Sequence, residues 1–289
     1  MNRRKLLGLA SIVVVAAAVL VLLAACGGGE EKAAKSTPAN SATSTAKAPE
    51  LQDGTLQVGS DVSYAPIEFY EEGTQNAQGL DVDLANALAE VLGVKADFIN
   101  TGFDGIIPAL NASRFDVLMS AMTVTDERSK EIDFIPYLSA GTDILVANGN
   151  PKNIKGIEDL SGLTVGVQIA TIQVDQLKAA NETLKAANKP QINVLTFDQN
   201  PLAVEQLRSG RADAVIADSP VVANDARLSS GKLQALGLTI EAAPYGIGVR
   251  KNSPELKTAV EGALSTLRSN GKYDEILAKW GLQGGALKP

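Results

Sequence analysis

Apolar positions along residues 51–289 follow two spacings in turn. Short apolar runs predict strands at 55–59, 68–70, 95–99, 116–119, 142–146, 163–167, 191–195 and 214–217. Apolar residues at helical spacing predict helices at 81–92, 105–112, 171–187, 201–209, 219–230, 254–270 and 273–280. This alternation predicts an α/β fold with parallel sheets covered by helices, in which ligands bind at the carboxyl ends of strands.

Two further β segments, Leu138 to Asp143 and Glu241 to Tyr245, separate the middle of this region from both ends. If both are crossovers, the first lobe comprises 51–138 plus 246–289, and the second comprises 143–240. The chain would then pass twice between the lobes and form a two-stranded hinge beside a cleft. The periodicity by itself is also compatible with other α/β arrangements.

The first 25 residues have the pattern of a targeting segment. Met1 to Lys5 is basic, and Leu6 to Ala25 is an almost unbroken apolar run that is long enough to span a bilayer. Leu23-Ala24-Ala25-Cys26-Gly27 resembles the bacterial lipoprotein signal, in which the chain is cut before a cysteine that becomes lipid-modified. We therefore expect a signal peptide at 1–25 and lipidation of Cys26; the alternative is an uncleaved membrane anchor. Both place the folded part outside the cytoplasm and tether it to a membrane, in the periplasm or on the outer face of the cell.

Residues 27–50 contain no aromatic and no large aliphatic side chain. Such a segment cannot bury enough apolar surface to fold. We expect residues 26–50 to be a lipidated cysteine followed by a flexible linker.

Composition excludes several chemistries. The 289 residues carry a formal charge of −7, and because Arg3, Arg4 and Lys5 contribute +3, the remainder carries −10. Nucleic-acid binding needs clustered cations, and we find no such cluster. The chain has no histidine, its one cysteine is Cys26, and we find no phosphate-binding or nucleophile-elbow motif. We therefore predict no catalytic residue, no metal site and no cofactor.

One local pattern breaks a helix rule. Thr125 suits a helix N-cap, and Asp126 and Glu127 suit the positive end of a helix dipole. A capping box favours Glu or Gln at the next position, where this chain has Arg128. Arg128 is therefore either a solvated surface charge or a cation placed to meet an anion.

Six segments, in order, resemble one family. They are LQVGSDVSYAPIEF, GLDVDLANALAEVLG, FDGIIPALNASRFDVLMSAMTVTDERSKEIDF, LSGLTVGVQIATIQ, GRADAVIADSPV and PYGIGVRKNSPELKTAVEGALSTLRSNGKYDEILAKWG. Together they resemble the family 3 extracellular solute-binding proteins, which are amino-acid receptors of bacterial ABC importers. The resemblance covers residues 52 to 283 and implies a two-lobed, periplasmic-binding-protein-like clamp of type II, with two hinge crossovers and a ligand cleft between the lobes.

The resemblance also implies roles for single residues. Arg128 corresponds to the arginine that pairs with the ligand α-carboxylate, for which a guanidinium is suited, and Asp218 to the aspartate that accepts the α-ammonium. Ala121 and Thr123 correspond to positions that offer backbone or hydroxyl groups to these two ends. The remaining predicted ligand-binding residues are first-lobe positions around the ligand side chain and the turn before a second-lobe helix, namely Asp61, Tyr64, Phe103, Gln168, Thr171 and Ile172.

Each role has a structural alternative. Asp218 could cap the helix that follows it, Asp61 could cap its own loop, and Tyr64 and Phe103 could be core residues. The family usually has Gly-Thr followed by a small residue where this chain has Ala170-Thr171-Ile172, so the bulk of Ile172 leaves the shape of the side-chain pocket open.

We assign structural roles to three further residues. Asp81 and Asp83 suit a helix start, and they lack the spacing of a calcium loop. Trp280 suits packing of the terminal helix.

The expected function is a monomeric receptor that is not an enzyme. It would bind a free L-amino acid by closure of the lobes and deliver it to an ABC permease in the membrane. Asp61 near the distal end of the ligand favours glutamine or a basic amino acid over an acidic one, since like charges repel. The alternatives are a secreted dehydratase acting on prephenate or arogenate, which shares this clamp fold, and a sensor that feeds a signalling partner.

Overall fold

The computed structural model describes residues 48–287. The expected signal peptide at 1–25 and the expected lipidation site Cys26 lie outside the described residues, as does the expected linker up to residue 47. The last three residues of that expected linker, 48–50, are part of the folded structure. Pro49–Leu51 form a 3-10 helix, and both Ala48 and Leu51 are buried. Among residues 48–287, no helix is both long and apolar enough to cross a membrane.

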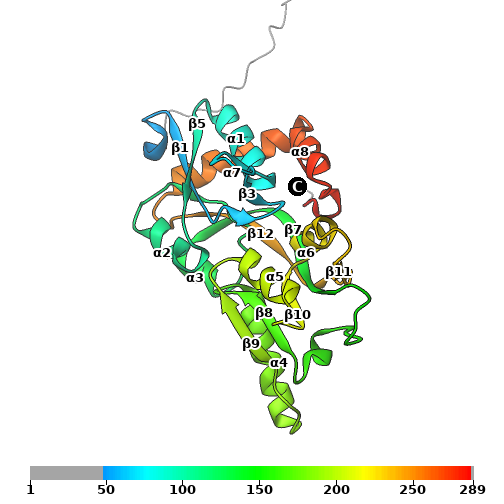
Figure 1. The fold of residues 1–289 in the computed structure, drawn as a ribbon. Coiled ribbons are helices and arrows are strands. Elements are labelled where there is room, and N and C mark those ends of the chain that lie inside the picture. The colour runs from blue at the N-terminus through cyan, green and yellow to red at the C-terminus, as the bar shows by residue number, and fades with distance from the viewer. Residues whose placement is uncertain (1–47, 288–289) are drawn as a thin grey trace, which may run out of the picture. The chain divides into compact units, whose positions relative to one another are not determined.

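A nine-stranded mixed sheet forms the centre of the fold (Figure 1). Its main order is β5(Lys95–Asn100), β1(Thr55–Ser60), β6(Val117–Leu118), β12(Ile240–Val249), β7(Asp133–Ala147), β10(Ala214–Asp218), β8(Thr164–Gln168), β9(Asn193–Phe197), and β11(Leu233–Ala235) pairs with β7. Strands β5, β1 and β6 are parallel to one another, as are β10, β8 and β9. Between the two parallel groups, β12 and β7 run antiparallel to each other and to their outer neighbours β6 and β10. The expectation of parallel sheets is therefore correct within each group and wrong at their junction.

Strands β7 and β12 connect the two lobes. The expected crossovers at 138–143 and 241–245 fall inside these strands, which pair from Ile240 with Thr142 to Val249 with Asp133. A continuous antiparallel pair satisfies the backbone hydrogen bonds that two separate linking loops would leave to solvent. The exact lobe boundaries stay a prediction.

Helices cover each parallel group. The first lobe contains α1(Leu80–Leu92), α2(Ile106–Asn111), α3(Arg128–Glu131), α7(Pro254–Ser269) and α8(Lys272–Trp280), and the second contains α4(Ile172–Ala186), α5(Asn200–Arg208) and α6(Ser219–Leu228). Helices α1, α7 and α8 pack against one another. Gly93 ends α1 in the left-handed conformation, φ 72°, as its position after the last apolar residue predicts.

Several short elements carry no strong sequence signal. A small three-stranded sheet is formed by β2(Ser63–Tyr64), β3(Glu68–Tyr70) and β4(Ala77–Gln78). Of these, only β3 was expected, because two-residue strands are too short for a periodic pattern. The other short elements are the 3-10 helices η3(Phe103–Gly105), η4(Ile157–Leu160) and η5(Gln283–Gly285).

Candidate ligand-binding site

A narrow cavity lies where the two lobes meet. It is lined by Asp61, Tyr64, Glu68, Phe103, Ser120, Ala121, Thr123, Arg128, Gln168, Thr171, Ile172, Gln173 and Asp218. Asp61 follows β1, Gln168 is the last residue of β8, and Asp218 is the last residue of β10. These are carboxyl ends of parallel strands, the edge at which α/β folds place ligands.

All ten residues predicted for the site line this cavity. The sequence did not indicate Glu68, Ser120 and Gln173. Ser120 immediately precedes the predicted Ala121, and Gln173 follows the predicted Ile172, so their proximity in sequence was the available signal. Glu68 lies in β3 and has no such signal, because only the small sheet turns its side chain toward the cavity.

Arg128 is held by both lobes. Its backbone N–H donates to the Thr125 hydroxyl at 3.2 Å, but the four-residue helix begins at Arg128 with Glu127 as its N-cap, so Thr125 is not the N-cap that the sequence predicted. Nη1 donates to the carbonyl of Thr123 at 2.8 Å, and Nη2 donates to the carbonyl of Ala170 in the second lobe at 2.9 Å. A guanidinium has five N–H donors, so three remain for an anion. The ring of Phe103 lies 5.5 Å from the guanidinium carbon, a cation–π distance.

Asp218 is buried opposite, at 6% exposure. Its Oδ1 accepts from Nε2 of Gln173 at 2.8 Å, and its Oδ2 accepts from the Tyr64 hydroxyl at 3.2 Å. The side chain makes no capping hydrogen bond to α6, although Asp218 occupies the N-cap position. Burial raises the pKa of this carboxyl group, and Gln173, Tyr64 and the charge of Arg128 oppose that rise. The carboxylate therefore faces the cavity, which favours the binding role over the capping alternative.

Asp61 accepts hydrogen bonds both from its own loop and from the opposite lobe. Oδ1 accepts from the Ser63 hydroxyl at 2.8 Å, and Oδ2 accepts from Nε2 of Gln168 at 2.8 Å. Burial raises its pKa, and both of these hydrogen bonds lower it again. No Lys or Arg of the described chain forms an ion pair with Asp61 within 4 Å.

The turn at Ala170-Thr171-Ile172 leads into α4. Ala170 has φ 62°, a left-handed conformation that favours glycine, so the family preference for glycine here has a direct backbone cause. Thr171 is the N-cap residue, and its hydroxyl donates to the carbonyl of Gln168 at 2.8 Å. The N-terminal end of α4 thereby faces the cavity, where its free N–H groups and dipole favour an anion.

Backbone groups of Ala121 and Thr123 already have hydrogen-bond partners within the protein. The N–H of Ala121, at φ 46°, donates to Oδ2 of Asp81 at 3.1 Å. Thr123 pairs with Tyr245 of β12 in an isolated β-bridge, and its carbonyl accepts from Arg128. Asp81 is fully buried and Asp83 accepts hydrogen bonds from Lys279 and Trp280, so both have structural partners. Residues 48–287 contain no cluster of His, Cys, Asp or Glu suited to a metal ion.

The cavity is closed by direct contacts between the lobes. Tyr64 with Asp218, Asp61 with Gln168, and Arg128 with Ala170 span it by hydrogen bonds. Its volume is only about 10 Å³, room for about one water molecule. A ligand of amino-acid size can therefore enter only when these contacts separate and the lobes part.

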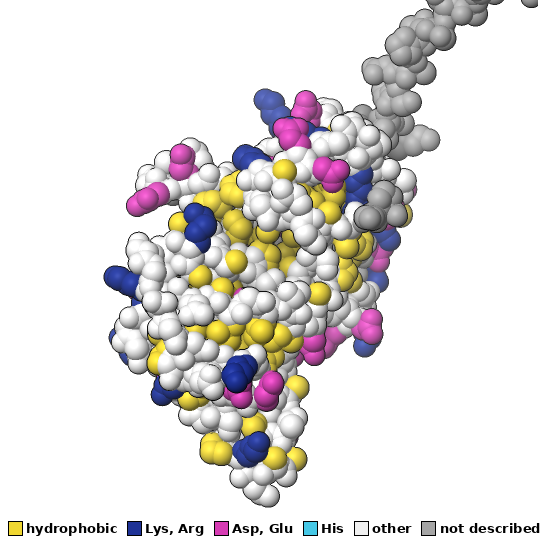
Figure 2. Space-filling model, turned by 90° about the vertical axis from the view of Figure 1, so that its right-hand side faces the viewer, with side chains coloured by type: hydrophobic (Ala, Val, Ile, Leu, Met, Phe, Trp, Pro, Cys, Tyr) yellow, Lys and Arg dark blue, Asp and Glu magenta, His cyan; other side chains and the backbone are white. Residues whose placement is uncertain are grey.

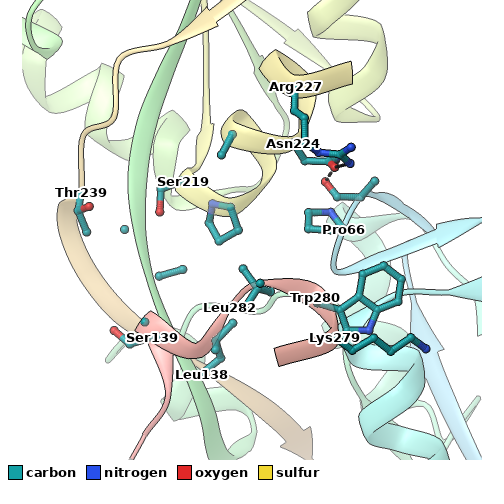
Figure 3. Close-up of a pocket in the computed structure, with 18 of the residues that line it drawn as sticks. Pro66, Leu138, Ser139, Ser219, Asn224, Arg227, Thr239, Lys279, Trp280 and Leu282 are labelled. Atoms are coloured by element: carbon teal, nitrogen blue, oxygen red, sulfur yellow. Dashed lines mark hydrogen bonds between the residues drawn. The ribbon is translucent and has the colours of Figure 1, made fainter. Parts of the chain in front are cut away.

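A second hollow lies beside the crossover strand β7. It is an open, largely apolar groove between α6 and the chain around α8, and hydrophobic side chains gather on this face (Figure 2). Asn224 and Arg227 of α6 lie across from Trp280 and Leu282 (Figure 3). Ala65 and Ser219 line the groove, whereas the residues just before them, Tyr64 and Asp218, line the cavity. The two hollows therefore adjoin at the contact between Tyr64 and Asp218.

Comparison with known families gives one match that covers most of the chain. The model described as "Bacterial extracellular solute-binding proteins, family 3" matches residues 56–283. The L-cystine-binding protein TcyJ of Escherichia coli (strain K12) is 32% identical over 228 residues, which cover 78% of this chain and 82% of that protein. The arginine-binding protein ArgT of Corynebacterium glutamicum is 33% identical over 237 residues, 82% of this chain and 77% of its own.

Solved structures agree with this match. An ancestral arginine-binding protein, 40% identical, superposes with a TM-score of 0.73 in its arginine complex and 0.72 in its glutamine complex. Each comparison covers 78% of this chain, with 98% of the arginine-bound and 97% of the glutamine-bound chain. The ancestral amino acid-binding protein AncCDT-1, a precursor of cyclohexadienyl dehydratase, is 39% identical with a TM-score of 0.72, over 80% of this chain and 96% of its own.

Proposed function

The chain belongs to the bacterial extracellular solute-binding proteins of family 3, and on this premise we propose that it is an amino-acid receptor that closes its two lobes around a free L-amino acid. It acts outside the cytoplasm, tethered to a membrane through lipidated Cys26, and delivers the amino acid as a monomer to the permease of an ABC importer. It has no catalytic role.

The observation that carries this proposal is the pair of opposite charges in one cavity. Arg128 comes from the first lobe and Asp218 from the second, and both line the closed cavity. Arg128 keeps N–H donors for a carboxylate, and the Asp218 carboxylate can accept an ammonium. A zwitterion that meets both groups contacts the two lobes together only when they are closed, so its binding favours closure.

The distal end of the site favours a cation or an amide. Asp61 and Glu68 line the cavity, and Arg128 is the one cation among the described lining residues. An acidic ligand would place a negative charge beside these carboxyl groups, and like charges disfavour each other. We therefore propose a basic amino acid or glutamine. That one 40% identical ancestral protein has been crystallised with both arginine and glutamine supports this choice.

A calorimetric or thermal-shift panel of the twenty amino acids tests the proposal. A ligand that binds only the folded state raises the melting temperature as its concentration rises. We expect a saturable increase with a basic amino acid or glutamine and none with aspartate or glutamate. A panel in which no amino acid shifts the melting temperature would contradict the proposal.

The dehydratase alternative has a fold relationship and a direct test. AncCDT-1, a precursor of cyclohexadienyl dehydratase, shares this fold. A dehydratase needs a general acid over the substrate ring, whereas the carboxylate of Asp218 is held by Gln173 and Tyr64. Incubation with prephenate should therefore yield no aromatic product, as followed by ultraviolet absorbance.

A further inference from the structure

Behind the proposed ligand cavity, two carboxyl groups are buried side by side. Glu68 of β3 is 1% exposed and lines the cavity, and Asp81 of α1 is 0% exposed. The N–H of Asp81 donates to the carbonyl of Ile67, the residue before Glu68, at 2.9 Å, and the two carboxyl groups accept hydrogen bonds from the adjacent residues Ser120 and Ala121. No Lys or Arg of the described chain forms an ion pair with either group. Two ionised carboxylates buried this close together repel each other, so one of them favours the protonated form.

The surrounding donors decide which group holds the proton. Asp81 accepts from the Tyr137 hydroxyl at 2.6 Å and from the backbone N–H of Ala121 at 3.1 Å. Glu68 accepts one such bond, from the Ser120 hydroxyl to Oε1 at 3.0 Å, and its buried Oε2 receives none from a described N–H or O–H donor. Asp81 is therefore the better-stabilised anion, and Oε2 of Glu68 is placed to carry the hydrogen.

The titratable groups that face Glu68 are carboxyl groups and tyrosine hydroxyls. Asp81 faces it from α1, Asp61 from the loop after β1, Tyr64 from β2 and Tyr137 from β7. The cation of the cavity, Arg128, acts on Asp218 of β10. Burial, followed by the charge of Asp81, raises the pKa of Glu68 well above its usual range, and burial raises the pKa of Asp81 to about 6.

We propose that Glu68 and Asp81 share one proton behind the ligand cavity and that a cationic ligand side chain displaces it, so that a basic amino acid binds with release of a proton and glutamine does not. This inference rests on the proposed function. A positive side chain near Asp61 and Glu68 stabilises the ionised form of Glu68, whereas without it Glu68 is neutral and holds the proton. The proton leaves Oε2 for the buffer, and the negative charge that remains pairs with the ligand cation.

Two consequences follow from linkage. Arginine or lysine should bind more tightly as the pH rises, by at most about tenfold per pH unit while one proton is released. The ratio of arginine affinity to glutamine affinity should follow the same trend. Glu68 would then set the preference between cationic and neutral ligands according to pH.

The test is calorimetry at pH 6 to 8 in buffers of different ionisation enthalpy, which reports the protons exchanged per ligand bound. The ligands are L-arginine, L-lysine, L-ornithine and L-glutamine. With the parent protein we expect a release of up to one proton for each cation that binds, in excess of that for glutamine. Protons exchanged by Asp218 cancel in this difference, because all four ligands carry the same α-ammonium.

Two variants test whether Glu68 is the group that releases the proton. Glu68→Gln keeps a donor toward Asp81 and an acceptor for Ser120, cannot ionise, and should abolish the excess release. Asp225→Asn is the matched control: Asp225 has a pKa raised by burial to about 6 but lies outside the cavity lining, and this variant should keep the full release.

The outcomes are distinct. Equal proton exchange for arginine and glutamine in the parent, or an excess release that survives in Glu68→Gln and disappears in Asp61→Asn, overturns the inference while amino-acid binding stands. If neither the three cations nor glutamine binds, the proposed function fails, and the inference fails with it.

Discussion

The hydroxyl of Tyr64 connects the first lobe to Asp218 of the second by two hydrogen bonds. It lies 3.2 Å from Oδ2 of Asp218 and accepts from the backbone N–H of Asp218 at 3.1 Å. One phenol therefore positions the carboxylate proposed to bind the ligand ammonium, and it does so only when the lobes are closed.

Replacing Tyr64 with phenylalanine should weaken ligand binding. The ring remains in place, but the carboxylate and the backbone N–H of Asp218 each lose a partner in the closed form, at a cost of about 1 kcal/mol for each hydrogen bond. We expect the Kd for the best ligand of the amino-acid panel to rise roughly thirtyfold, as measured by calorimetry. Tyr70→Phe is the control, because Tyr70 is exposed and outside the cavity lining. An unchanged Kd in Tyr64→Phe would show that this contact does not contribute to closure.

Replacing Arg128 with alanine should nearly abolish binding. A buried ligand carboxylate left without its cation costs about 3 kcal/mol or more, which corresponds to at least about a hundredfold in Kd. Arg128→Lys keeps the charge but lacks the planar fork, so it should recover only part of the affinity. If Arg128→Ala bound its ligand as tightly as the parent, the carboxylate assignment would be wrong.

Replacing Ala170 with glycine should stabilise the fold. Ala170 holds φ 62°, which costs an L-residue about 1–2 kcal/mol, and this exceeds the added unfolded-state entropy of a glycine. We expect the free energy of unfolding in urea to rise by about 0.5–1 kcal/mol. Ala179→Gly, in the interior of α4, should instead lower it by about 1 kcal/mol.

Replacing Asp225 with asparagine should change how stability depends on pH. Burial raises the pKa of Asp225 from 3.8 to about 6 in the folded protein. A raised carboxyl pKa contributes stability that is present below about pH 4 and is lost as the pH rises through about 6. The variant cannot ionise, so its free energy of unfolding relative to the parent should increase between pH 4.5 and pH 7.5. At about 1.4 kcal/mol per pKa unit the increase is at most roughly 3 kcal/mol.

Denaturation in urea at the two pH values measures this difference. Asp133→Asn provides a contrast of opposite sign: burial raises the pKa of Asp133, but the hydrogen bonds and charges of Lys257 and Lys251 together lower it by more. That variant should lose stability relative to the parent at pH 7.5 and lose less at pH 4.5. A pH-independent difference for Asp225→Asn would show that its carboxyl group is not perturbed in the fold.

The sequence by itself determined the main helices and most strands of the two parallel groups, and it indicated ten of the thirteen residues that line the candidate cavity. Helix positions follow from local periodicity and end signals such as Gly93, since a helix makes its hydrogen bonds within one segment. Arg128 stood out because a capping box favours Glu or Gln at its position. The family resemblance then implied that Arg128 pairs with the ligand carboxylate.

Only the tertiary structure decided the rest. It joined two expected short segments into long antiparallel strands and brought Glu68 and Asp81 together behind the cavity. It also turned the Asp218 carboxylate away from the helix it could have capped. Each of these depends on partners many residues distant, such as Tyr64 for Asp218 and Ser120 for Glu68. Local propensity contains no information on those partners, because burial and pairing across a sheet exist only once the lobes have folded.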